Sequence, residues 1–123
     1  WVTFSSATPL QYALADYLKE PAHYLGLSHF YQKKRDLFAS QFAGSKWKVL
    51  PSAGSFFQCL DYSAISNEKD VDLADRLTRE IKVASIPVSV FYETDPGDKI
   101  LRFCFAKEDE VLVEAAKRLI QIL

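Results

Sequence analysis

The run from Ile100 to Ala106 constrains the fold most strongly, because every residue in it except Arg102 is apolar. A short apolar run that is rich in β-forming residues predicts a strand in the core of the molecule. Successive side chains on a strand point to opposite faces, so Arg102 is expected to share a face with Ile100 and Cys104. The sequence therefore commits a guanidinium to largely apolar surroundings. The other face of the strand carries Leu101, Phe103 and Phe105.

Arg102 needs an anionic partner in such a place. A buried charge is costly unless it is paired, and the planar guanidinium suits a carboxylate bound through two parallel hydrogen bonds. The residues alone leave two sources open, an acid of the chain such as Asp61 or a ligand. Buried arginines usually find an internal partner, so a structural salt bridge is the default expectation from this strand alone.

Size and charge place the chain among ordinary globular domains. It has 123 residues, of which 49% are hydrophobic and 25% charged, and its formal net charge is -1. This length suits one core, so we expect residues 1–123 to form a single domain. The only basic cluster, Lys33-Lys34-Arg35, is followed by Asp36, which is typical of a solvated helix face. We therefore expect no nucleic-acid partner.

Other classes of site find little support. Cys59 and Cys104 lie in apolar runs and are expected to be reduced core thiols. His23 and His29 are six residues apart, not the three or four that share a helix face, so no metal site is expected. No apolar run approaches the length of a membrane span, and a cytoplasmic location with no membrane partner is the expectation. The absence of Met and the opening at Trp1 favour a piece of a longer protein.

Hydrophobic periodicity predicts four helices and four strands. In the long second helix, the apolar side chains of Tyr24, Leu27, Tyr31, Leu37, Phe38 and Phe42 are expected to form one packing stripe. Asp95-Pro96-Gly97-Asp98 predicts a turn. Helices first and last with strands between them predict an α+β fold, a small, mainly antiparallel sheet with helices packed on one side. The expected helices are Leu10–Leu18 with Thr8 as its cap, Ala22–Ala43, Asp70–Lys82 and Glu108–Leu123; the expected strands are Trp47–Leu50, Ser55–Tyr62, Val83–Ile86 and the strand of Arg102.

Four segments in this order resemble the C-terminal part of the class I/II aminotransferases, the fold type I pyridoxal-phosphate enzymes. Phe4–Gln11 resembles the segment that leads into the small domain, and Pro51–Phe57 resembles a Pro-x-x-Gly-x-Phe-Phe turn and strand. Ala84–Phe91 resembles an Ile-Pro-x-Ser-x-Phe element, and Leu101–Lys107 an Arg-x-x-Phe-Ala signature. The resemblance covers nearly the whole chain and is closest to the methionine and kynurenine aminotransferases.

The resemblance implies that residues 1–123 are the C-terminal small domain and that the catalytic large domain is absent. It implies that Arg102 binds the substrate α-carboxylate, which would supply the missing anion. Phe56 would border the substrate pocket, although core packing explains a phenylalanine there equally well. Ser89 and Phe91 would bind substrate with Arg102, although a residue in this loop could instead only shape the mouth of the site.

The resemblance also implies a cofactor, pyridoxal 5'-phosphate, bound mainly by the absent large domain through a lysine. No lysine of this chain lies in the corresponding motif, so no catalytic or cofactor-binding residue is expected here. The full-length enzyme would be a homodimer that moves an amino group between an amino acid (methionine, aromatic or similar) and a 2-oxo acid. The isolated piece is expected to be inactive and a weakly associating monomer.

Two positions depart from the family pattern. Lys82 stands where the family usually ends a helix with Gly, so it must either become left-handed or end the helix differently. Val88 stands where neighbouring subfamilies often have Gly, which leaves the substrate group open. Two other functions also remain open, a stand-alone module that binds a small carboxylate, and the small domain of a C–S lyase, a cyclopropane-forming synthase or a transcription regulator with this fold.

Overall fold

The computed structural model describes residues 5–122, which fall into two compact units that divide between Phe30 and Tyr31. Phe4, in the first resembling segment, and Leu123, at the end of the last predicted helix, lie outside the described residues. The first unit contains α1 (Thr8–Tyr17), α2 (Ala22–Leu25) and the start of α3 (Leu27–Ser40). Helix α1 includes Thr8 instead of being capped by it, and its first turn holds a proline as predicted.

The single helix predicted over Ala22–Ala43 is wrong in two respects. The chain breaks it at Gly26, which ends α2, because glycine is a poor helix former. Tyr24 and Leu27, predicted to belong to the packing stripe, are 39% and 46% exposed and lie in the first unit. Only the part of the stripe in the second unit packs, where Phe38 and Phe42 are buried.

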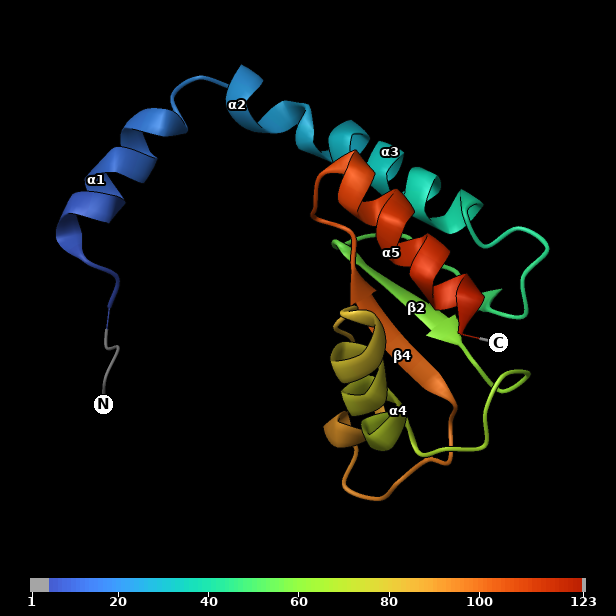
Figure 1. Cartoon of the computed structure of the whole chain (residues 1–123). Helices are drawn as coiled ribbons and strands as arrows, with labels where there is room; N and C mark the ends of the chain where they lie inside the picture. Colours follow the sequence, from blue (N-terminus) through green and yellow to red (C-terminus); the bar gives the residue numbers. More distant parts are fainter. Residues whose placement is uncertain (1–4, 123) are drawn as a thin grey trace. The chain divides into compact units, whose positions relative to one another are not determined.

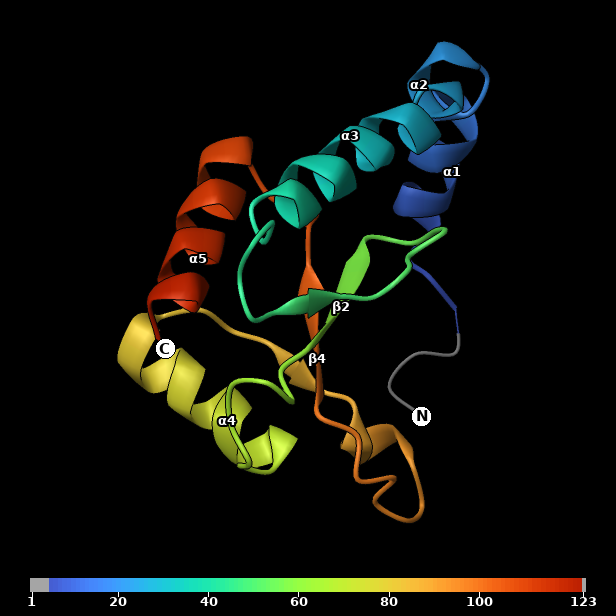
Figure 2. The ribbon, with the colours of Figure 1, turned by 90° about the vertical axis from the view of Figure 1, so that its right-hand side faces the viewer.

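The second unit is built on a four-stranded antiparallel sheet with the order β1-β2-β4-β3 (Figure 1). Helices α3, α4 and α5 all cover the same face of this sheet, as the two views in Figures 1 and 2 agree. The fold is therefore α+β with helices on one side, which confirms the predicted class. The strands are β1 (Lys48–Val49), β2 (Phe57–Asp61), β3 (Ile86–Pro87) and β4 (Ile100–Cys104), and the helices are α4 (Asp70–Arg76) and α5 (Asp109–Gln121).

Aromatic and aliphatic side chains fill the space between the sheet and its helices. Trp47 lies 6.1 Å from the ring of Phe103, and its indole N–H donates to the carbonyl of Leu119 over 2.9 Å. This hydrogen bond satisfies the one polar atom of the indole inside an apolar core. The buried apolar residues are Phe38, Phe42, Trp47, Leu60, Tyr62, Leu73, Ala74, Leu77, Val83, Leu101, Phe103, Phe105, Leu112, Ala116 and Leu119.

The segment before β4 differs from its predicted form. The strand expected over Val83–Ile86 is observed at Ile86–Pro87, because Val83 turns into the core after the helix ends. A single 3-10 turn, η2 (Ser89–Phe91), follows it and was not predicted. The predicted turn is confirmed at Gly97, whose φ is 74° and whose N–H donates to the Asp95 carboxylate over 2.8 Å.

The end of α4 is unusual. The chain continues from it as a π-helical turn, η1 (Leu77–Ile81), and then reaches Lys82 with φ 61° and ψ 34°. The first of the two possibilities for Lys82 is thus confirmed, because the residue is left-handed. A residue with a Cβ in this conformation costs about 1–2 kcal/mol relative to the right-handed form. The ammonium of Lys82 recovers part of that cost by donating to the carbonyl of Arg79 over 2.7 Å.

Replacing Lys82 with Gly should raise the free energy of unfolding by about 1 kcal/mol, because glycine adopts this conformation without strain. Thermal unfolding of the two proteins measures the difference. Lys82→Ala is the matched control, since it removes the ammonium but keeps the Cβ, and it should give no gain. Equal unfolding temperatures for the Gly and Ala variants would contradict the strain at this position.

Glu68 ties the two central strands to the start of α4. Its carbonyl accepts hydrogen bonds from the hydroxyl of Tyr62 at 3.0 Å and the ammonium of Lys99 at 2.9 Å. Its carboxylate accepts from Arg76 at 2.7 Å and from Ser66 at 2.8 Å. The hydrogen bond from Arg76 holds the pKa of Glu68 below its ordinary value. Burial raises the pKa of Tyr62 to about 12, so the phenol stays protonated and keeps donating.

Glu68→Gln should destabilise the fold at pH 7 by less than about 1 kcal/mol, since both partners are about a third exposed. Because the folded pKa is lowered, this contribution is present above the ordinary pKa of 4.5 and is lost as pH falls through the folded value. Denaturant unfolding between pH 7 and pH 3 should show the gap to wild type closing. Glu93→Gln, at an exposed position, should show no gap. A gap that widens on acidification would refute this role of the carboxylate.

Within residues 5–122, no helix is long and apolar enough to cross a membrane. The same residues contain no group of three or more histidine, cysteine or acidic side chains placed to hold a metal ion.

Candidate functional site

Arg102 lies at the centre of the sheet face that the helices leave open. Its position in the middle of β4 places it opposite Cys59 of β2 and Ile86 of β3. Burial alternates along β4 as the sequence predicts, because Leu101 and Phe103 are buried against the helices whereas Arg102 is half-buried on the other face. The local pattern of the strand therefore decides which way the guanidinium points.

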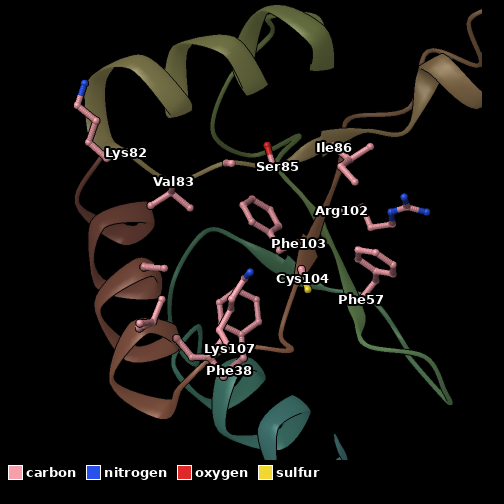
Figure 3. Close-up of a pocket in the computed structure, with 14 residues that line it drawn as sticks. Phe38, Phe57, Lys82, Val83, Ser85, Ile86, Arg102, Phe103, Cys104 and Lys107 are labelled. Carbon is pink, nitrogen blue, oxygen red and sulfur yellow. The ribbon is translucent and has the colours of Figure 1, made fainter. Parts of the chain in front are cut away.

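Two aromatic rings contact the guanidinium. Its Cζ atom lies 4.2 Å from the ring centroid of Phe57, at the start of β2, and 4.8 Å from that of Phe91, at the end of η2. Figure 3 shows Arg102 and Phe57 on the same side of β4, while Phe103 points to the other side toward Val83. Ring faces attract a cation at these distances without using its N–H groups. The rings thus hold the guanidinium and leave its donors for another partner.

No anion occupies those donors in the described part of the chain. The Nε atom of Arg102 is buried and has no hydrogen-bond partner within residues 5–122. Asp61, the internal acid considered above, instead accepts a hydrogen bond from the N–H of Ser63 at 2.8 Å, which lowers its pKa. A buried donor without a partner costs about 1–3 kcal/mol, and a carboxylate placed beside Arg102 would remove that cost. The internal salt bridge expected from the strand alone is absent among residues 5–122.

The other predicted site residues differ in their surroundings. Phe91 contacts Arg102 although it is 60% exposed. Phe56 is 42% exposed, and its ring lies 6.1 Å from Tyr31 and 4.7 Å from Phe57, not against Arg102. Ser89 uses its hydroxyl and its N–H to donate to Asp70, each over 2.7 Å. Substrate contacts by Phe56, Ser89 and Phe91 remain predictions.

Sequence reasoning missed two residues of this region, Phe57 and Asp70. Phe57 shares the face of Cys59 by strand alternation, and an antiparallel register with β4 brings it opposite Cys104. The sequence pattern could have predicted this register. The contact between Asp70 and Ser89 joins residues 19 apart, and only the folded chain shows it.

The two cysteines are not in the core as expected. Cys59 and Cys104 are free and half-buried, and strand alternation puts both on the face of Arg102.

A cavity of about 340 Å³ opens beside the site, where β4 continues past Ile86, the first residue of β3 (Figure 3). Its wall is mainly apolar, and it includes Arg102, Phe57 and Cys104 from the site itself. The hydroxyl of Ser85 at its wall is buried and has no hydrogen-bond partner within residues 5–122. The remaining lining residues are Phe38, Lys82, Val83, Ala84, Ile86, Phe103, Lys107, Val111, Leu112 and Ala115.

Comparisons with known proteins found a matching family and related enzymes. The model of the family "Aminotransferase class I and II" matches residues 2–119. The chain is 46% identical to the methionine aminotransferase of Escherichia coli K12 over 123 residues, which cover 99% of this chain and 32% of that protein. It is 28% identical to a kynurenine–oxoglutarate transaminase of Dictyostelium discoideum, covering 99% of this chain and 33% of that protein. The chain thus spans about a third of the length of these relatives.

Solved structures give the same result. The crystal structure of Escherichia coli YbdL, identified as a methionine aminotransferase, matches with a TM-score of 0.88 at 46% identity, over 98% of this chain and 32% of that one. The N-succinyldiaminopimelate aminotransferase of Mycobacterium tuberculosis matches with a TM-score of 0.87 at 27% identity, over 99% of this chain and 32% of that one. The family model covers almost the whole chain, and the resemblance inferred from the four sequence segments is confirmed. The chain belongs to the class I and II aminotransferase family.

Proposed function

We propose that residues 1–123 are the C-terminal small domain of a pyridoxal-phosphate-dependent aminotransferase, in which Arg102 binds the α-carboxylate of the substrate. The observation that carries this proposal is a guanidinium on an open sheet face, with a buried Nε that the described residues leave unpaired. A carboxylate would satisfy that donor and the charge together, in the planar geometry that arginine favours. Family membership supports the chemistry, transfer of an amino group between an amino acid and a 2-oxo acid.

The residues around Arg102 can orient such a carboxylate. Phe57 and Phe91 contact the guanidinium and restrict its movement, and their rings exclude water from its surroundings. Both effects favour a single bound geometry, which is the contribution that a positioning arginine makes to catalysis. The role of this chain in the reaction would be to bind and aim the substrate, and the small domain would help to close the site.

The cofactor would be held elsewhere in the full-length protein. Bound pyridoxal phosphate supplies the electron sink that amino-group transfer requires, and it needs a lysine to hold it covalently. Within residues 5–122, only two lysines are even half-buried. Lys34 binds Asp109 at 2.9 Å, and Lys99 donates to the carbonyls of Asn67 and Glu68. We therefore expect the cofactor lysine to lie outside this chain, and we assign no step of the reaction at the cofactor to it.

The substrate class follows from similarity and from the surroundings of Arg102. The methionine aminotransferase of Escherichia coli and the kynurenine transaminase of Dictyostelium discoideum are relatives at 46% and 28% identity. The open face beside Arg102 offers Phe57, Phe91, Ile86 and two thiols, which suit a sulfur-containing or aromatic side chain better than a charged one. We propose methionine and aromatic amino acids as donors.

Arg102→Ala in the full-length protein should lower kcat/KM for L-methionine by about 100-fold, as expected when a charge-assisted carboxylate contact is lost. Arg102→Lys should recover part of this loss, because lysine restores the positive charge but not the planar group that binds a carboxylate through two hydrogen bonds. Arg79→Ala is the control, since Arg79 is exposed and pairs only with Asp75 within the described residues. Measuring 2-oxo acid, ammonia and thiol separately distinguishes a transaminase from a C–S lyase. Wild-type kcat/KM in Arg102→Ala would refute the proposal.

The isolated 123-residue chain should show no transamination with saturating pyridoxal phosphate, because it offers no lysine for the cofactor. It should sediment as a monomer that associates weakly, whereas the full-length protein should be a homodimer. Analytical ultracentrifugation at micromolar concentration tests the second point. A tight dimer of the isolated chain, or turnover by it, would contradict the proposal that dimer contacts and the cofactor belong to the large domain.

A further inference from the structure

We propose that Asp70 is a positioning residue for carboxylate binding, because it fixes the turn that holds Phe91 against Arg102. This inference rests on the function proposed for Arg102. Asp70 itself does not contact the guanidinium in the described structure, so it would act through Ser89 and the turn that follows.

Asp70 is a buried carboxylate whose hydrogen bonds reach across the fold. It is the first residue of α4 and is only 4% exposed. Its Oδ2 accepts the N–H of Ser89 and its Oδ1 accepts the hydroxyl of Ser89, both over 2.7 Å. Oδ1 also accepts the N–H of the next residue, Val71, over 2.9 Å. Two of the three donors thus belong to Ser89, 19 positions away, so each carboxylate oxygen of Asp70 accepts one hydrogen bond from that residue.

Ser89 begins the turn that carries Phe91. The turn η2 consists of Ser89, Val90 and Phe91, and the N–H of Tyr92 closes it by donating to the carbonyl of Ser89 over 3.0 Å. A single 3-10 turn has little stability of its own, because nucleating a helix costs more than its first hydrogen bond returns. Something outside the turn must therefore hold it, and Asp70 does so at its first residue.

The ring of Phe91 is mostly exposed, so its backbone decides where it lies. It is 60% exposed, so core packing does not determine its position, yet it lies 4.8 Å from the Cζ of Arg102. The backbone of the turn sets where the ring lies, and the carboxylate of Asp70 sets the backbone. Loosening that carboxylate should let the ring move away and let water reach the guanidinium, which weakens the binding of a carboxylate without touching the reacting atoms.

The test is Asp70→Asn in the full-length protein. An asparagine carries an NH2 group in place of one carboxylate oxygen, so the N–H of Ser89 or that of Val71 loses its acceptor, and the negative charge that strengthens these hydrogen bonds is lost. We expect KM for L-methionine to rise about tenfold, as for loss of a hydrogen bond to a charged group, with kcat within about twofold. Asp72→Asn is the matched control: it removes the same charge from the same helix turn, but at an exposed position, and KM should stay unchanged.

A second comparison separates positioning from simple loss of stability. If Asp70 acts through Arg102, adding Asp70→Asn to Arg102→Ala should not raise KM further, whereas a general folding defect would add in both backgrounds. Phe91→Ala should reproduce the rise in KM, and it keeps the test decisive if Asp70→Asn fails to fold, because an exposed ring is not needed for the core. An additive double variant, or a Phe91→Ala enzyme with wild-type KM, overturns the inference.

The two proposals fail in different ways. Wild-type activity in Arg102→Ala would remove the proposed function and this inference with it. An impaired Arg102→Ala enzyme alongside an Asp70→Asn enzyme that behaves like Asp72→Asn would leave the function of Arg102 standing and remove only the role of Asp70.

Discussion

The structure of the second unit depends on one constraint, a sheet that is covered on one face and open on the other. The helices α3, α4 and α5 bury one set of alternating side chains, and this burial supplies the core. The same alternation leaves Arg102 on the uncovered face, where two rings hold it and no carboxylate of residues 5–122 neutralises it. The core and the binding proposed for Arg102 thus use opposite faces of the same sheet.

Polar contacts at the start of α4 connect the two faces. Glu68 accepts hydrogen bonds from Tyr62, just after β2, and from Lys99, just before β4. Two residues later, Asp70 accepts a hydrogen bond from Ser89, the first residue of the turn that carries Phe91. A buried carboxylate is tolerated when several donors satisfy it, and Asp70 meets this condition with three donors within the described chain. The start of α4 therefore contacts both the ends of the central strands and the turn beside Arg102.

Local pattern was enough to predict much of the fold. The alternation along β4 follows from neighbouring residues and is observed, and the family pattern identified Lys82 as one of two possibilities, of which the left-handed conformation is observed. The break at Gly26 and the exposure of Tyr24 were missed, because helical periodicity says which side chains share a face and not whether anything covers that face. In the site, Arg102 was found because a charge in an apolar run is conspicuous, whereas the grip of Asp70 on Ser89 depends on residues that only the tertiary fold brings together.

The brevity of β3 has a consequence for how the site could respond to a ligand. Only two residue pairs join Ile86 and Pro87 to β4, whereas five join β2 to β4. Few ladder bonds mean that the edge carrying the aromatic turn can open locally at a lower free energy than the centre of the sheet. A ligand that bridges the centre and this edge would suppress such opening, so part of its binding free energy would be spent on ordering the protein, and amide exchange at the edge would record it.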